Sequence, residues 1–369
     1  MSAARTLPLA DICEQDRAIA SNGDASKRYL GLEHIESESG RIVDTAPENG
    51  EPRGTSFKFD ARHVLYGKLR PYLNKVALPS FVGRCSTELI PLLPREGVDR
   101  NYLGWLLRSP SILAAAVKTT TGSRMPRTDM ADFLKTPVSL PPLAEQKRIA
   151  AKLSAAMEEV DKARRAVNEQ LALAARLPFN VIAQSLNGET RRVLLSDAME
   201  HMTQGAGKDW AKYELLGATR NGVAPAKAAA GKNPGRYKPV DDDTVFYNPM
   251  RILIGSIAML PHRSPPAITS PDYVVVRGRK GILASRWFYH WLRSPLGEAF
   301  IRSNAKGAVR ERLTWKFLSS RTIQVPSWES QHRYLPALER HEELVGRISA
   351  QLEAVNALPA RILADAFGT

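Results

Sequence analysis

Apolar residues recur along two long stretches of the chain in the alternating four- and three-residue rhythm of a helix that packs along another helix. The first stretch runs from Leu143 to about Gln184, contains no Gly and only one Pro, Pro178, and consists mainly of good helix formers. Its apolar stripe comprises Ile149, Leu153, Ala156, Val160, Ala163, Val167, Gln170 and Ala174. Adding 185 to the first seven positions gives Tyr334, Leu338, His341, Val345, Ile348, Leu352 and Val355. The pattern predicts two long helices that pair with each other.

Each predicted helix follows a block of shorter apolar runs that Pro and Gly interrupt. The runs 64–69, 75–78 and 89–93 predict strands, and a helix-like stretch ends at Leu107 in the first block and at Leu292 in the second. Each block therefore mixes strands with helix. The expected fold class is α+β, with a globular α/β domain followed by a long helix.

Short motifs recur in the same order in both halves of the chain, which indicates a tandem duplication. The run 64–70 aligns with 245–251 at an offset of 181, and Leu-Arg-Ser-Pro at 107–110 recurs at 292–295 at an offset of 185. The larger offset persists in Gly122 and Gly307, Arg127 and Arg312, Pro141 and Pro326, Gln146 and Gln331, and Arg148 and Arg333. Collinear matches of this number exclude chance identity. We expect globular domains at 1–142 and 188–327 and helices at 143–187 and 328–369.

Positive charge is concentrated in two parts of the chain. The 369 residues include 52 Lys and Arg against 38 Asp and Glu, a formal charge of +14. Residues 53–135 hold 14 basic and 6 acidic side chains, and residues 201–320 hold 19 basic and 8 acidic ones. Two basic blocks on one duplicated chain indicate two contacts with one polyanion.

Several protein classes are excluded by composition. Two cysteines, Cys13 and Cys85, are too few for a disulfide framework or a zinc site. The longest apolar run, 252–260, falls far short of the roughly 20 residues that a membrane span needs. The first residues lack a secretory signal pattern. We expect a cytoplasmic protein with no membrane contact.

Three motifs in order resemble the specificity subunit of type I restriction–modification systems, and a second version of the same set follows in the second half. The first-half motifs are Tyr-Gly-Lys-Leu-Arg-Pro-Tyr-Leu-Asn-Lys-Val at 66–76, Cys-Ser-Thr-Glu at 85–88 and Pro-Pro-Leu-Ala-Glu-Gln-Lys-Arg-Ile at 141–149. The second-half motifs are Tyr-Asn-Pro-Met-Arg at 247–251, Gly-Ser-Ile at 255–257, Ser-Pro-Asp-Tyr-Val-Val at 270–275, and a degenerate Pro326, Gln331 and Arg333. The resemblance covers nearly the whole chain and is weakest over 1–50 and 190–240.

The resemblance implies a DNA-binding subunit of a phage-defence system. Each globular block would be a target-recognition domain that reads one half of a bipartite double-stranded DNA sequence. The helices would pair antiparallel as a coiled-coil spacer. Two adenine methyltransferase (modification) subunits would dock on the chain, and a motor endonuclease can join that complex.

Helix length fits the spacer role on physical grounds. A helix of about 30 residues spans about 45 Å, which is on the scale of the 34–36 Å between half-sites one duplex turn apart.

Basic side chains beside aromatic and turn residues are the candidates for DNA contact, because Lys and Arg neutralise phosphates and can hydrogen-bond guanine edges. Around the first motif these are Tyr66, Lys68, Arg70 and Lys75, although the same residues could belong to a structural strand and turn. The basic loop 121–127 is the stronger candidate, with Ser123, Arg124 and Arg127. The second half supplies Asn248, Arg251, Lys306, Arg310 and Arg312.

The residues that open the two helices are candidates for the interface with the partner subunits: Gln146, Arg148, Gln331 and Arg333. Glu145 is expected to complement the positive end of the helix dipole. In the second helix Ser330 replaces that Glu and Pro336 falls within the first turns, which leaves the start of this helix open.

Catalytic machinery is not expected in this chain. Asn248-Pro249-Met250-Arg251 lacks the second Pro and the aromatic residue of an amino-methyltransferase motif. Gly205-Ala206-Gly207-Lys208 departs from a phosphate-binding loop at both ends, and no catalytic, cofactor or metal site is predicted. The alternatives left open are a stand-alone DNA-binding protein of the same architecture without enzymatic partners, and a DNA-modifying enzyme in its own right.

Overall fold

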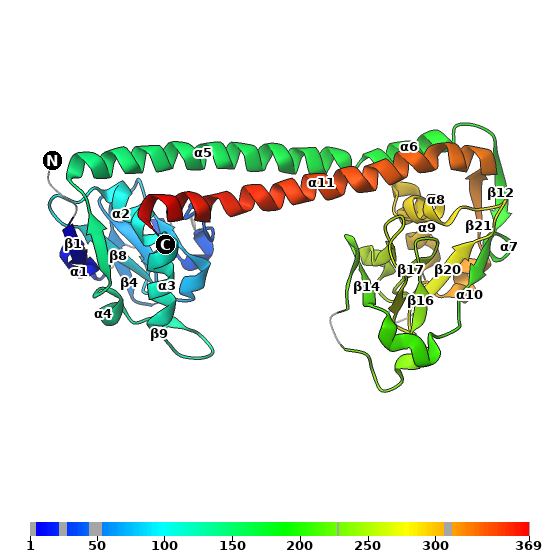
Figure 1. Ribbon diagram of the computed structural model, residues 1–369, viewed down its shortest axis with the longest axis horizontal. Coiled ribbons are helices and arrows are strands. Elements are labelled where there is room, and N and C mark those ends of the chain that lie inside the picture. Colours follow the sequence, from blue (N-terminus) through cyan, green and yellow to red (C-terminus); the bar gives the residue numbers. More distant parts are fainter. Residues whose placement is uncertain (1–4, 22–27, 44–53, 227–228, 306–311, 369) are drawn as a thin grey trace. The chain divides into compact units, whose positions relative to one another are not determined.

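The computed structural model describes residues 5–21, 28–43, 54–226, 229–305 and 312–368 (Figure 1). The chain forms two compact units, the first built from Met1–Ala166 with Leu352–Thr369 and the second from Val167–Gln351. Each unit therefore contains one globular block and segments of both long helices.

A four-stranded antiparallel sheet forms the centre of the first unit. Its strand order is β2 (Cys13–Gln15), β8 (Leu89–Pro94), β5 (Val64–Gly67) and β6 (Val76–Ala77). A second sheet orders β3 (Arg28–Leu30), β7 (Gly83–Ser86) and β4 (Ser56–Phe59), with β3 parallel to β7. The predicted strands 64–69, 75–78 and 89–93 are confirmed as β5, β6 and β8.

Helices and short strand pairs complete this block. The helices are α1 (Leu9–Ile12), α2 (Arg100–Leu107), α3 (Pro110–Lys118) and α4 (Met130–Phe133), with 3-10 turns η2 (Leu32–His34) and η3 (Pro71–Leu73). The antiparallel pairs are β1 (Arg5–Pro8) with β11 (Pro137–Leu140) and β9 (Thr120–Thr121) with β10 (Arg127–Thr128).

The helix α2 shows how local sequence and packing agree. Asp99 caps it by accepting a hydrogen bond from the Tyr102 backbone N–H at 2.9 Å. Its apolar residues Leu103, Leu106 and Leu107 then pack with Val64 of the central sheet in one buried cluster. The end of this helix at Leu107, which the sequence predicted, is confirmed.

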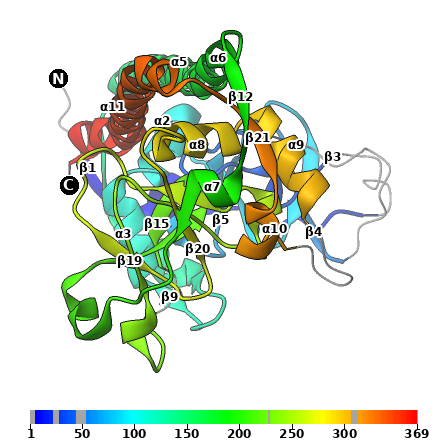
Figure 2. The ribbon, with the colours of Figure 1, turned by 90° about the vertical axis from the view of Figure 1, so that its right-hand side faces the viewer.

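The second unit repeats this order. Its central sheet is β13 (Met199–His201), β20 (Val274–Gly278), β17 (Val245–Tyr247) and β18 (Ile257–Met259). The other sheet is β15 (Gly222–Pro225), β14 (Leu215–Thr219), β19 (Ala267–Thr269) and β16 (Lys238–Val240), so it gains the strand β15 beside the counterpart of β3. The pair β12 (Thr190–Leu194) and β21 (Thr322–Pro326) lies side by side in Figure 2.

The remaining helices of the second unit have counterparts in the first. They are α7 (Leu195–Ala198), α8 (Ser285–Leu292), α9 (Pro295–Asn304) and α10 (Trp315–Ser319), and the 3-10 turn η6 (Ile252–Ile254) corresponds to η3. The 3-10 turns η4 (Gly207–Lys212) and η5 (Pro234–Arg236) match no element described in the first unit. The helix α8 lies 185 positions after α2, and β17 lies 181 positions after β5. The tandem duplication predicted from short motifs is thus confirmed at the level of whole elements.

Three helices occupy the two stretches that the sequence predicted as long helices. They are α5 (Leu143–Ala174), α6 (Leu177–Ser185) and α11 (Trp328–Phe367). The starts of α5 and α11 are 185 positions apart, so Pro336 does not displace the second helix, which was the question that the sequence left open. The first helix breaks before Pro178, whereas α11 continues through the equivalent Pro359.

Within each unit the two long helices run antiparallel. In the first unit Arg164 of α5 donates to Asn356 Oδ1 at 3.0 Å, and Phe367 at the end of α11 meets Tyr102 edge-on at 5.5 Å. In the second unit the residues that follow along α5 face earlier residues of α11, with Ala174 near Ile348. Leu153, Val160, Val167 and Ala174 of the stripe are buried, as expected of a packed seam. Gln170, which was predicted on the same stripe, is exposed.

Two further features concern the cysteines and the apolar helices. Cys13 and Cys85 are free and buried, and burial raises the pKa of each thiol to about 12. No helix of the described ranges is long and apolar enough to cross a membrane.

Candidate nucleic-acid interface

A turn and a loop that are far apart in sequence meet on the surface of the first unit. The turn follows β5 and contains η3, and the loop joins β9 to β10. The Arg70 backbone N–H donates to Pro126 O at 2.8 Å, and the Thr128 N–H donates to Lys68 O at 2.9 Å. This turn-and-loop surface brings together five of the predicted DNA-binding residues, Lys68, Arg70, Ser123, Arg124 and Arg127.

The side chains at the tip of this surface are free to meet a ligand. Arg70, Ser123 and Arg124 are exposed, and Lys68 is half-buried. The backbone of Arg70 lies in the left-handed region at φ 52°, which costs a non-glycine residue roughly 1–2 kcal/mol. Gly122, at φ 87°, opens the loop without that cost.

Arg127 has a carboxylate partner at the base of the loop. Its Nε lies 3.0 and 3.1 Å from the two carboxylate oxygens of Glu88, and its Nη2 lies 2.9 Å from Oε1. This pairing raises the pKa of the Arg127 guanidinium. Glu88 therefore compensates the charge of Arg127 and orients its side chain, so Arg70 and Arg124 are the stronger cations of the surface.

Two predicted residues are not part of this surface. Tyr66 is buried, and its ring stacks on Phe133 with centroids 5.0 Å apart. The prediction that Tyr66 contacts DNA is therefore wrong, because its side chain belongs to the core, where burial raises its pKa to about 12. Lys75 points inward and donates to Leu32 O at 2.8 Å, so the structure does not bring it to the tip.

In the second unit the equivalent turn follows β17. Arg251 is exposed there, and Arg312 is exposed next to Leu313, whose N–H donates to Pro249 O at 3.1 Å. Asn248 instead holds the turn, because its Oδ1 accepts from the Met250 N–H at 3.0 Å. Lys306 and Arg310 lie outside the described residues.

Bulky apolar residues were missed as members of these surfaces. Tyr72 and Met125 are 52% and 45% exposed in the first unit, and Met250 and Ile254 are 43% and 66% exposed in the second. These residues lie in or beside the turn and loop motifs that the sequence singled out, but an apolar residue at such a position can equally well be buried in the core. Only the exposed area separates the two interpretations.

Gln146 and Gln331 are clamps inside the fold. Gln146 Oε1 accepts from the Asp99 N–H at 2.8 Å, and its Nε2 donates to Gly97 O at 3.0 Å and Pro141 O at 2.8 Å. Gln331 makes the same three bonds, at 2.7, 3.0 and 3.0 Å, with residues 185 positions later, namely Ala284, Ile282 and Pro326. The two side chains are 1% and 0% exposed. The prediction of a partner interface is therefore wrong for both glutamines, whose bonds fasten each long helix to its globular block.

The neighbouring arginines remain accessible. Arg148 is exposed and pairs with Glu145 at 2.6 Å in the first turns of α5. Arg333 is exposed and lies 4.0 Å from Glu329 in α11. Glu145 stands in the first turn as expected, where its charge complements the helix dipole. Contact of Arg148 and Arg333 with partner subunits stays a prediction.

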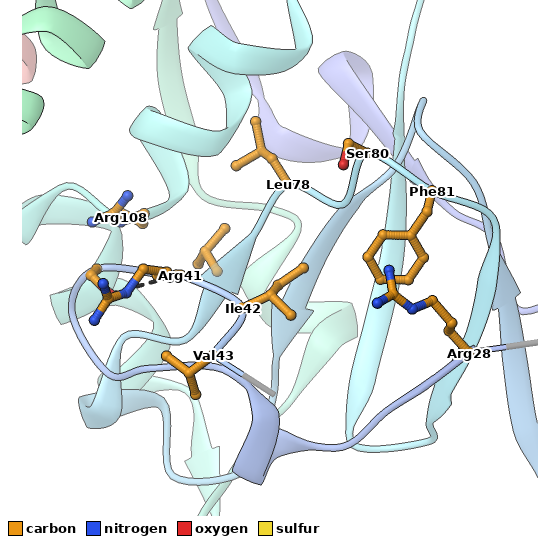
Figure 3. Close-up of a pocket in the computed structure, with 11 residues that line it drawn as sticks. Arg28, Arg41, Ile42, Val43, Leu78, Ser80, Phe81 and Arg108 are labelled. Atoms are coloured by element: carbon orange, nitrogen blue, oxygen red, sulfur yellow. Dashed lines mark hydrogen bonds between the residues drawn. The ribbon is translucent and has the colours of Figure 1, made fainter. Parts of the chain in front are cut away.

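A hollow of about 590 Å³ in the first unit is lined by Ile42, Val43 and Leu78 among others. Figure 3 shows these residues, with Arg28 beside Phe81 at one side. The charge of Arg41 at the edge of the hollow is compensated by Glu36, whose oxygen lies 3.1 Å away.

The arginines of the repeated Leu-Arg-Ser-Pro motif, Arg108 and Arg293, donate hydrogen bonds to backbone carbonyl groups within their own units. Arg108 donates to Glu38 O and lies 4.5 Å from the centroid of the Trp105 ring, and burial lowers its pKa to about 10. Arg293, its counterpart in the second unit, donates to Arg220 O and Ile257 O. No group of three or more His, Cys, Asp or Glu residues able to hold a metal occurs in the ranges that the structure covers.

Comparison with known proteins agrees with this geometry. Residues 70–171 match the family model of the type I restriction modification DNA specificity domain. The Escherichia coli type I restriction enzyme EcoDI specificity subunit is 29% identical over 164 residues, 44% of this chain and 36% of that protein. The resemblance to type I specificity subunits is confirmed.

More distant specificity subunits match most of the chain. The Escherichia coli EcoBI specificity subunit is 23% identical over 307 residues, 70% of this chain and 63% of that protein. The match thus spans about a third of the first relative and just under two thirds of the second. Both relatives are named as specificity subunits, in agreement with the expectation that this chain is not itself the enzyme.

Solved structures share the fold. A chain from a type I R-M system superposes with a TM-score of 0.72 at 20% identity, covering 100% of this chain and 98% of that one. The HsdS subunit from Thermoanaerobacter tengcongensis superposes with a TM-score of 0.53 at 22% identity, covering 99% and 97%. At these identities the likeness concerns the fold, which is the expected α+β tandem arrangement of specificity subunits.

Proposed function

We propose that this chain is the non-catalytic, DNA-reading subunit of a type I restriction–modification complex in the cytoplasm. Its two globular domains read the two halves of a bipartite target. Two adenine methyltransferase subunits dock on the chain, and a motor endonuclease joins where the system has one.

One observation carries the proposal. Equivalent turns follow β5 in the first unit and β17 in the second, and arginines at or beside each turn are exposed to solvent: Arg70 and Arg124 in the first unit, Arg251 and Arg312 in the second. The two basic blocks of the sequence supply these surfaces. Guanidinium groups on exposed turns bind phosphates and guanine edges. Because the copies differ in sequence, they would read different half-sites.

The helices support the docking part of the proposal. In the second unit a hollow of about 530 Å³ lies between α5, α6 and α11, and its walls include the exposed Leu173 and Leu177 together with Leu344 and Ile348. Exposed apolar side chains of this kind are typical of surfaces that bind another protein. The exposed Arg148 and Arg333 would add polar contacts at the helix starts.

Co-purification and DNA selection test the proposal together. We expect the full-length chain to form a stable assembly with two copies of an adenine methyltransferase from its own cell. We further expect that assembly to select a split sequence from random duplexes. A chain that binds DNA and forms no such assembly would favour the stand-alone alternative, and methyl transfer by the chain alone would identify an enzyme.

A further inference from the structure

Equivalent turns of the two units expose a large apolar side chain next to an arginine. In the second unit Ile254 is 66% exposed, the highest value among the large apolar residues of the described ranges. It lies three residues after Arg251. In the first unit Tyr72 is 52% exposed and lies two residues after Arg70. Leaving a side chain of this size in water forgoes the stabilisation of burial, so its position needs an explanation.

The turn that carries Ile254 is held by backbone hydrogen bonds. The N–H groups of Ile254 and Ser256 both donate to Arg251 O at 3.2 Å, and the Gly255 N–H donates to Ile252 O at 2.9 Å. Gly255 adopts φ 81°, a conformation that favours glycine. Ile252 is buried in the core below. The exposure of Ile254 is therefore a property of a rigid turn.

A concave surface adjoins this turn. A hollow of about 470 Å³ is lined by β14 and β15 on one side and by Arg251, Ile254 and Ser256 on the other. Ser256 Oγ donates to Ala218 O at 2.7 Å and fastens the turn to β14. Arg220 stands at the rim, and its carbonyl is held by Arg293 at 2.8 Å. The hollow therefore combines apolar side chains such as Ile254 with hydroxyl groups and with the arginines Arg220 and Arg251.

The apolar side chain of Ile254 can recognise one feature of a DNA base pair, an exposed methyl group. An isoleucine cannot hydrogen-bond, so it cannot distinguish the donors and acceptors of base edges. In the major groove the apolar group that distinguishes one base pair from the others is the thymine C5-methyl. Arginines beside it bind the phosphates that flank the groove.

We propose that Ile254 is a specificity-determining residue of the second domain and that it packs on a thymine methyl group in the half-site that this domain reads. Arg251 binds the adjacent DNA backbone. This inference rests on the DNA-reading function proposed above and names the base feature that one surface recognises.

Replacing thymine by deoxyuridine removes only the methyl group and tests the inference directly. The site is first selected from random duplexes by the full-length chain with its methyltransferase. Each thymine of the selected site is then replaced singly by deoxyuridine. We expect one replacement in one half-site to weaken binding about fourfold, the effect of one buried methyl group. The Ile254→Ala variant should bind the thymine duplex about fourfold more weakly and show no further loss with deoxyuridine at that position.

Leu194→Ala is the matched control. Leu194, on β12 of the second unit, is an aliphatic side chain of the same size as Ile254 and is 39% exposed. The Leu194→Ala variant should keep the wild-type sensitivity to deoxyuridine. Unfolding curves of both variants should match the wild type, since neither side chain is buried. Failure to select any sequence would contradict the proposed function. A selected site to which Ile254→Ala retains the wild-type preference for thymine over deoxyuridine, or whose second half-site lacks thymine, would overturn the inference and leave DNA reading intact.

Discussion

The clamp formed by Gln146 makes a quantitative prediction about stability. Its side chain is 1% exposed and makes three hydrogen bonds, to the Asp99 N–H, Gly97 O and Pro141 O, at 2.8 to 3.0 Å. These bonds join the segment before α2 to the end of β11 and the start of α5. Replacing Gln146 by Ala removes all three at once and leaves their partners without a protein group to bond.

The expected loss follows from the price of unpaired polar groups. At about 1 kcal/mol for each lost bond in a partly buried setting, Gln146→Ala should lower the free energy of unfolding of the first unit by about 3 kcal/mol. For a unit of this size that corresponds to a fall in Tm of roughly 6–12 °C. Gln331→Ala should destabilise the second unit at least as much, because the side chain of Gln331 is 0% exposed.

Urea unfolding of the full-length chain, followed by a probe in each unit, measures these losses. The adjacent Lys147→Ala, which removes an exposed side chain of α5, should unfold like the wild type. A change below about 0.5 kcal/mol for Gln146→Ala would refute the reasoning, since that is the range of neutral surface substitutions. So would a loss of partner docking without a loss of stability, which is the result that an interface residue would give.

Three further predictions concern charge, pH and helix length. Glu88→Gln should release Arg127 toward DNA, tightening binding and steepening the plot of log affinity against log salt by about one; an unchanged slope would place Arg127 away from DNA. Burial lowers the pKa of His341 from its ordinary value of 6.5, so the second unit should keep its stability above that pH and lose it as the pH falls. The His341→Phe variant should show a weaker pH dependence of Tm between about pH 7 and about pH 5 in thermal unfolding. Inserting seven residues after Ala166 and another seven after Gln351 should change the gap in the selected DNA sequence; altered half-sites would contradict a spacer role for the helices.

Much of the fold could be predicted because its signals are local. The heptad stripe of α5 and α11 and the strands β5, β6 and β8 depend on side-chain periodicity within short windows. The duplication is recorded in the order of short motifs, and the structure repeats it down to the three bonds of Gln146 and Gln331. The start of α5 follows from Pro141 and Pro142 before it, whereas the sequence left the start of α11 open.

Burial decided the candidate site, and burial is set by residues distant in sequence. Tyr66 was predicted to contact DNA, but its ring stacks on Phe133 in the core. Arg127 was predicted as a DNA-binding cation, but its charge is compensated by Glu88, 39 positions away in the sequence. Ile254 was not among the predicted site residues, and the structure shows that its side chain is exposed.

By itself the sequence determined the repeat, the helical periodicity and the excess of positive charge, because each is a property of neighbouring or regularly spaced residues. Only the tertiary structure decided which basic, aromatic and amide side chains reach solvent. That choice depends on contacts between strands and loops whose separation along the chain carries no local signal, so a basic, aromatic or amide side chain of the same type can lie in the core or on the surface.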